Sequence, residues 1–319
     1  MSKMSTTAAT QRCPRCGNEV RSDSYTCAFC GKRLREELIE RTPIFKRIEE
    51  EWYAPASFFK KLLYLFINPP RAFWEINHER KKSPGSLIVL FSSIAWGFIG
   101  LSIFIHLNFA VLFSTFPPEF RLLIVFFYGL LIFLFFFLFG YVFQKLFFKL
   151  LIWLYTKGAN YAVNYSERLE QRFGTRPQEK RDYEERDLSP FSIYRGGTLL
   201  QTQEAFRVKM MMSAFAPVLI INLIKALLLA IALPNVSVIN LNPVIINSAL
   251  SEVLDPNLPV WAVCDLLDFL TLAIWIPYLI TISIRELANS GTWRVLLSSY
   301  IISILAGIIL YLMRPTLLG

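Results

Sequence analysis

Histidine is scarce in this 319-residue chain, which contains only two, His78 and His106. Two histidines without a His-Glu-x-x-His motif cannot build an ordinary intramembrane zinc protease. The sequence also has no Gly-x-Ser-x-Gly element for a nucleophilic serine and no glycine-rich phosphate loop. Because no familiar catalytic equipment is visible, we predict that the protein is not an enzyme.

Charge is missing from long stretches of the chain. Five apolar runs cover Ser83–Pro118, Leu122–Gln144, Met210–Leu233, Leu258–Ile284 and Val295–Met313, and three of them lack Lys, Arg, Asp and Glu altogether. Each run can cross a hydrocarbon core of ~30 Å as a helix, which satisfies its own backbone hydrogen bonds. The sequence therefore predicts an all-α membrane protein with five transmembrane helices, at about 86–113, 121–145, 210–233, 258–284 and 294–313.

Basic residues are almost absent from alternate connections between these runs. Residues 1–85 hold 16 Lys and Arg and residues 156–209 hold ten, whereas residues 234–257 hold none. Because basic loops stay on the cytoplasmic side, this alternation predicts a cytoplasmic N-terminus, an outside C-terminus and five crossings. Residues 1–41 are polar and offer no apolar core for a secretory signal peptide, so we expect the first span to act as the insertion signal.

Four of the five cysteines form two pairs near the N-terminus. Cys13-Pro-Arg-Cys16-Gly and Cys27-Ala-Phe-Cys30-Gly are separated by a ten-residue spacer. Two residues between thiolates allow both sulfurs to reach one tetrahedral ion, and the following glycine permits the tight turn. We interpret Cys13, Cys16, Cys27 and Cys30 as ligands of one structural zinc ion, with a disulfide pair or a redox Cys-x-x-Cys as alternatives. Cys264 lies alone in the fourth span and is interpreted as a small buried residue.

The first 82 residues divide into a head and a linker. Residues 1–41 are predicted to be a cytoplasmic head with a zinc ribbon at 11–33, and residues 42–82 to form amphipathic helices in the membrane interface, starting at Thr42-Pro43. The Asn68-Pro69-Pro70 step should end one such helix and open another. Residues 83–319 would be the five-helix membrane domain. The predicted interface anchors are Phe58, Phe59, Lys60, Lys61, Phe73 and Trp74.

The segment before the first span resembles the Yip-domain family, multi-pass relatives of the Rab-interacting Yip proteins. The likeness rests on the Asn68-Pro69 step, on Phe73 and Ile76 just after it, and on residues 206–217 with their internal Pro217. It extends from about Ala56 to the end of the chain. The resemblance implies five membrane helices, a cytoplasmic N-terminus and a role in membrane shaping or traffic. It carries over no partner-binding residue, since no short motif for that contact is present.

Three charged residues fall inside predicted spans. Lys225 in the third span, and Asp265 and Asp268 in the fourth, should lie at similar depth if the two helices are antiparallel neighbours. A charge there costs ~3 kcal/mol unless it is paired or wetted, so we predict an ion pair of Lys225 with Asp265 or Asp268. A polar conduit, helped by Pro217 and Pro277, and snorkelling of the side chains to the surface are the alternatives.

The sequence as a whole favours a non-enzymatic membrane scaffold or adaptor whose zinc ribbon recruits a cytoplasmic protein partner. The alternative is a small solute or ion transporter that uses Lys225, Asp265 and Asp268. The partners expected are the lipid bilayer, that cytoplasmic protein and another copy of the chain in a homo-oligomer; a nucleic acid is not expected, although the head is basic. The fused zinc ribbon points to the plasma membrane of a bacterium or archaeon.

Overall fold

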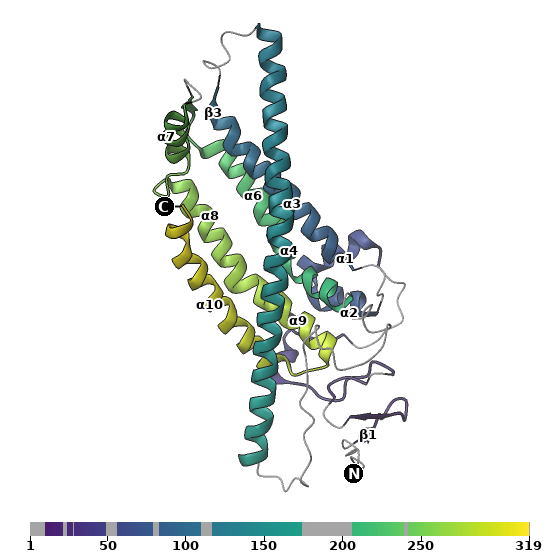
Figure 1. Cartoon of the computed structure of the whole chain (residues 1–319). Helices are drawn as coiled ribbons and strands as arrows, with labels where there is room; N and C mark the ends of the chain where they lie inside the picture. The colour runs from purple at the N-terminus through teal and green to yellow at the C-terminus, as the bar shows by residue number, and fades with distance from the viewer. Residues whose placement is uncertain are drawn as a thin grey trace, which may run out of the picture. The chain divides into compact units, whose positions relative to one another are not determined.

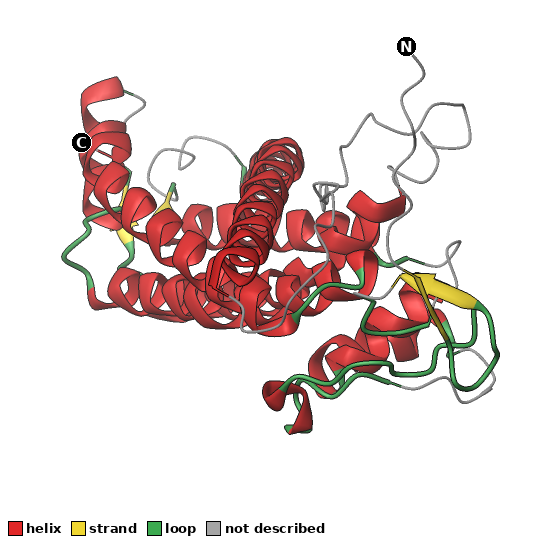
Figure 2. Ribbon diagram, turned by 90° about the horizontal axis from the view of Figure 1, so that it is seen from below, coloured by secondary structure: helices red, strands yellow, loops and turns green. Residues whose placement is uncertain are grey.

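The computed structural model describes residues 10–21, 24–27, 29–48, 56–78, 83–109, 117–173, 206–238 and 242–318. Helices dominate these residues, and strands occur only as two short pairs, as Figure 2 shows. The first pair is the antiparallel hairpin of β1 (Thr10–Arg12) and β2 (Glu19–Arg21), and the second is the parallel pair of β3 (Leu107–Asn108) and β4 (Val236–Ser237).

Five helices in the described residues are long and apolar enough to cross a membrane, in agreement with the predicted number of spans. The candidate spans are Gly85–His106, Phe120–Tyr165, Phe206–Ala232, Pro259–Ala288 and Thr292–Leu310. They belong to α3 (Gly85–His106), α4 (Pro118–Phe173), α6 (Ala216–Ala232) with the helical residues before it, α8 (Pro259–Leu270) with α9 (Ile276–Ala288), and α10 (Thr292–Leu318). The remaining helices are η1 (Leu38–Arg41), α1 (Phe58–Ile67), α2 (Pro69–His78) and α7 (Pro243–Val253).

Helix α4 is a single uninterrupted helix of 56 residues (Figure 1). Pro118 stands at its start, where a missing backbone N–H costs nothing, and no further proline occurs before its end at Phe173. At ~1.5 Å per residue it is far longer than a hydrocarbon core is thick. The helix therefore continues well past Gln144, where the predicted second span ends.

Two spans change their helical winding close to a proline. In the third span the 3-10 segment η3 (Ser213–Phe215) precedes Pro217, and in the fourth the π-helical segment η4 (Thr271–Trp275) precedes Pro277. Proline lacks the N–H that would complete the regular hydrogen-bond ladder, and its ring crowds the preceding turn. Both prolines are thus accompanied by a local change of helical winding.

The structure corrects two of the predicted boundaries. The first span does not reach residue 113, because α3 ends at His106 and the chain turns into the β3–β4 pair. No α-helix starts at Thr42-Pro43: residues 38–41 form the 3-10 helix η1 and residues 43–45 form a turn. The break at Asn68 is as predicted, since α1 ends at Ile67 and α2 begins at Pro69.

The described chain forms two compact units whose boundaries differ from the predicted domains. Unit 1 comprises Met1–Gly85, Lys149–Ala214 and Ala273–Gly319, and unit 2 comprises Ser86–Phe148 and Phe215–Leu272. In unit 1, α9 is buried on nearly all sides and packs on α10 and on α2, which itself packs on α1. The head thus belongs to the same compact unit as α9 and α10.

Unit 2 has its main apolar cluster where β4 and α7 meet the helices. Val236, Val238, Ala249, Val253 and Cys264 are buried together there. The described part of the connection 234–257 therefore packs against the ends of the unit 2 helices. Cys264 is 4% exposed and sits in this cluster, as expected of a small buried residue.

Candidate metal centre and its attachment to the helices

Two knuckles with the same backbone pattern present the four cysteines. In the first, the N–H of Cys13 donates to Asn18 O and the N–H of Gly17 donates to Cys13 O; in the second, Cys27 and Gly31 make the equivalent bonds to Lys32 O and Cys27 O. Gly17 and Gly31 have φ values of 72° and 67°, a conformation that glycine adopts without strain. Each Cys-x-x-Cys-Gly sequence therefore forms the tight turn that its glycine was predicted to permit.

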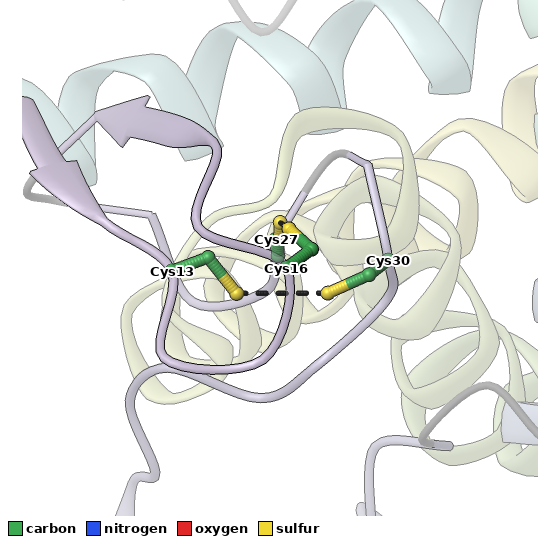
Figure 3. A group of neighbouring side chains, drawn as sticks. All are labelled: Cys13, Cys16, Cys27 and Cys30. Carbon is green, nitrogen blue, oxygen red and sulfur yellow. Dashed lines mark hydrogen bonds between the residues drawn. The ribbon is translucent and has the colours of Figure 1, made fainter.

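The four sulfur atoms converge on one point (Figure 3). Cys13 Sγ lies 3.5 Å from Cys30 Sγ, Cys16 Sγ lies 3.7 Å from Cys27 Sγ, and all four lie within 4.8 Å of one another. A tetrahedral zinc ion with Zn–S bonds of about 2.3 Å requires sulfurs about 3.8 Å apart. The cysteine set therefore fits one tetrahedral metal ion, and within the described ranges no other group of three or more His, Cys, Asp or Glu side chains is placed to hold one.

The thiols resist ionising together. Backbone N–H groups of Cys16 and Arg15, with help from neighbouring thiols, lower the pKa of Cys13 to about 6 against the cost of desolvation. At Cys30 the backbone N–H of Lys32 favours the thiolate, but desolvation and the sulfurs of Cys13, Cys16 and Cys27 outweigh it and raise the pKa to about 12. A divalent cation would neutralise this repulsion, which is the chemistry expected of a closed four-cysteine zinc site.

The head buries few apolar side chains of its own. Its cluster consists of Cys13, Val20 and Cys27, with Cys16, Cys30 and Leu34 packed against it. Such a small core provides little folding free energy, so metal binding would supply much of it.

A buried ion pair attaches the head to the connection between α9 and α10. Arg47 Nε donates to Glu40 Oε1 at 2.7 Å, and the side chains are 2% and 0% exposed. Thr292 Oγ1 donates to the same carboxylate oxygen at 2.6 Å, and Arg47 Nη2 donates to Ser290 O. The carboxylate thus has both a cation and a hydroxyl donor, which offsets part of the cost of burying charge.

Two further contacts join the knuckles to the same connection. Asn289, the left-handed residue that ends α9, exchanges hydrogen bonds with Thr26: its Oδ1 accepts from Thr26 N at 3.0 Å and its Nδ2 donates to Thr26 O at 2.9 Å. Glu37 accepts from Tyr25 Oη at 3.0 Å and from the backbone N–H of Trp293 at 2.8 Å. Desolvation and the charge of Glu37 raise the pKa of Tyr25 to about 12. We refer to Glu37, Glu40, Arg47, Asn289 and Thr292 as the head clamp.

Sequence reasoning did not find the head clamp. Its contacts with the α9–α10 connection join residues more than 240 positions apart, and each of these residues alone is typical of a solvated polar position in a loop. The one usable signal was the turn Asn289-Ser290-Gly291-Thr292, which is rich in residues that end and start helices.

Lys225, in the third candidate span, and Asp268, in the fourth, form one of the two predicted ion pairs. Lys225 Nζ lies 2.8 Å from both carboxylate oxygens of Asp268, and the side chains are 14% and 56% exposed. Asp265 lies one turn earlier on α8, is partly buried and makes interactions of its own. The paired geometry favours the structural role over snorkelling.

The predicted interface residues divide into exposed and buried ones. On α1, Phe59 is 77% exposed and forms an apolar stripe with Leu63 and Ile67, while Lys60 is also exposed and Phe58 packs edge-on against Phe59. Trp74 on α2 is partly buried. Lys61 and Phe73 are each 0% exposed, so their side chains do not reach lipid, contrary to the expectation.

Comparison of the chain with known protein families, with curated proteins and with solved structures finds no match. The resemblance to the Yip-domain family therefore remains a prediction from a few residues. The features that bear on the function of this protein are the four-cysteine cluster, the head clamp and the helices.

Proposed function

We propose that this protein is a non-enzymatic integral membrane scaffold or adaptor, whose zinc ribbon presents a binding surface to a cytoplasmic protein. The observation that carries the proposal is the attachment of the head with the four-cysteine cluster to the helices: Glu40 bonds Thr292 at the start of α10, and Thr26 bonds Asn289 at the end of α9. A partner bound to such a head would be held at a fixed position on the helices. A role in membrane shaping, as in the Yip-domain family, and a bacterial or archaeal plasma membrane belong to the same proposal.

The proposed topology has support from the contacts inside each unit. The head and the α9–α10 connection, both expected in the cytoplasm, touch through Thr26 and Asn289. Residues 107–108, near the outer end of the predicted first span, pair with residues 236–237, in a connection expected outside, as β3 and β4. These contacts support a common side of the membrane for each pair of segments, which is the arrangement proposed from the charge distribution.

The test is affinity purification of the intact protein from gently solubilised native membranes, with bound zinc measured on the same sample. Cys13→Ser/Cys16→Ser is the test variant, and Cys264→Ser is the matched control because its thiol lies outside the cluster. We expect one zinc ion per chain and a partner set that disappears together with zinc in the test variant only. An unchanged partner set in a zinc-free variant that remains folded would contradict the adaptor function.

A transport function is the second candidate, because the half-exposed Asp268 carboxylate lies one turn before the π-helical segment η4. In reconstituted vesicles a transporter would lose flux in Asp265→Asn and Asp268→Asn and keep it in Cys13→Ser/Cys16→Ser. The adaptor function predicts the opposite dependence for partner binding. Running both assays on the same three variants separates the two functions.

A further inference from the structure

Residues 38–47, which we name the strap, begin with the 3-10 helix η1 and continue in turn and irregular conformations beside the C-terminal end of a candidate span. Three consecutive strap carbonyls are bonded by side chains of α9: Tyr278 Oη donates to Ile44 O at 3.1 Å, and Arg285 donates to Phe45 O and Lys46 O. The ring of Phe45 also packs edge-on against Tyr278, with centroids 5.3 Å apart. Irregular backbone is tolerated at membrane depth only where such partners satisfy it.

The depth of the strap follows from α10. The candidate span Thr292–Leu310 has 19 residues and extends ~28 Å, about the thickness of the hydrocarbon core. Where α10 crosses the membrane with this span, its first turn lies near the membrane boundary. The strap starts at this level, because Glu40 accepts from Thr292, and it then follows α9 through Tyr278 and Arg285.

The exposed side chains of the strap and of neighbouring Trp293 are of the kinds found at a membrane boundary. Leu38 is 79% exposed, Ile44 58% and Trp293 57%. Arg41 and Lys46, close to Leu38 and Ile44 in the sequence, are exposed as well, while the carboxylates of Glu37 and Glu40 are engaged in the head clamp. Trp at a span end and apolar residues flanked by cations are typical of the zone between acyl chains and phosphates.

We propose that the strap and Trp293 form a lipid-binding surface that seats the zinc head on the membrane. Leu38, Ile44 and Trp293 enter the acyl region of the nearer leaflet, and Arg41 and Lys46 bind the phosphates of anionic phospholipids. This contact does not depend on the head recruiting a protein. It fixes which side of the head a partner can approach, because the strap side is covered by lipid.

Photo-crosslinking in the full-length protein tests the proposal. Benzoylphenylalanine is placed at Leu38, at Ile44 or, as the control, at Glu19, an exposed position flanked by the polar Asn18. Each protein, checked for zinc content and a single gel-filtration peak, is reconstituted in vesicles of phosphatidylcholine and phosphatidylglycerol and irradiated. We expect phospholipid adducts by mass spectrometry at Leu38 and Ile44 and none at Glu19.

Charge removal tests the phosphate contact separately. In Arg41→Gln/Lys46→Gln, adducts at Ile44 should persist, but the preference for phosphatidylglycerol should fall by about fivefold for each cation removed. Crosslinks to a second copy or to another protein, or no lipid adducts at Leu38 and Ile44, would overturn the proposal.

Trp293 provides a measurement that needs no crosslinker. If Trp293 lies among lipids, brominated phospholipid should quench the emission that is lost in Trp293→Phe. Because Trp96, Trp153 and Trp275 also lie in candidate spans, that component is compared with itself in vesicles without brominated lipid. An unquenched Trp293 component would also overturn the proposal, whatever the fate of the crosslinker variants.

Discussion

Among single residues, Glu40 and Arg47 carry the clearest energetic consequence. Glu40→Ala would leave the guanidinium of Arg47, 2% exposed, without its carboxylate, and would also remove the acceptor of Thr292. Breaking a buried pair in this way costs about 3–5 kcal/mol. We expect the variant to release the head while α3 and α4 stay folded, measured as faster proteolysis within residues 10–48.

The matched control is the neighbouring pair of Arg33 and Glu36, which is more exposed, at 19% and 40%. Removing such a pair costs about 0–1 kcal/mol, so Glu36→Gln should leave the proteolysis rate almost unchanged. Equal protease resistance of Glu40→Ala and Glu36→Gln would contradict the role assigned to Glu40.

Lys225 and Asp268 permit a charge-exchange test. Lys225→Asp or Asp268→Lys alone places two like charges in the membrane region and should cost at least ~3 kcal/mol, seen as a lower yield of folded protein and a lower Tm in detergent. The double variant should regain most of the lost yield and Tm, because it restores an ion pair in which the positive and negative charges have exchanged positions. Glu252→Gln, an exposed position on α7, is the control expected to change neither quantity. Failure of the double variant to recover would count against a structural pair.

Among the elements, α3 and α4 touch where glycine permits close approach. A Cβ at Gly100 would lie 2.4 Å from Phe136 Cγ and 2.8 Å from its Cβ, whereas a Cβ at Gly129 would meet Leu101 and Phe104 at ordinary distances of 3.4 Å or more. Overpacking a close contact costs typically 1–3 kcal/mol. We therefore expect Gly100→Ala to lower the Tm in detergent and Gly129→Ala, on the same pair of helices, to leave it unchanged or raise it. Equal effects would mean that the close contact contributes nothing.

The elements were predictable where their signals are local. Long apolar runs identified all five spans, and Asn68-Pro69 located the break between α1 and α2 to the residue. The end of α3 at His106 was missed because the apolar run continues beyond it: the hydrogen bonds of His106 to Asn235 and Ala230 depend on a helix over 120 residues away. Residues 42–47 of the strap were wrongly predicted to start a helix, because Arg285 and Tyr278 bind the carbonyls of this segment from outside it.

On the scale of the whole molecule, the chain was expected to have a separate head, a linker and a helical body. The ligand set of the head follows from spacing alone, but its attachment does not. Thr26 and Asn289 are 263 positions apart, and neither residue type signals the other. The four-cysteine head, which the sequence presents as a separate domain, is therefore part of unit 1, together with α9 and α10.

Zinc removal should therefore affect residues distant from the cysteines in sequence. Without metal the knuckles lose most of their folding energy, so Thr26 and Tyr25 should no longer hold Asn289 and Glu37. After chelation, hydrogen exchange followed by mass spectrometry should show faster exchange for residues 285–294 and for residues 10–37. Peptides from the α3–α4 contact at Gly100 serve as the internal control and should not change. Because α9 and α10 also pack directly on each other, the change should stop within about one turn of the connection. Unchanged hydrogen exchange at residues 285–294 in fully zinc-free protein would contradict this prediction. It would show that the head clamp stays formed without the metal.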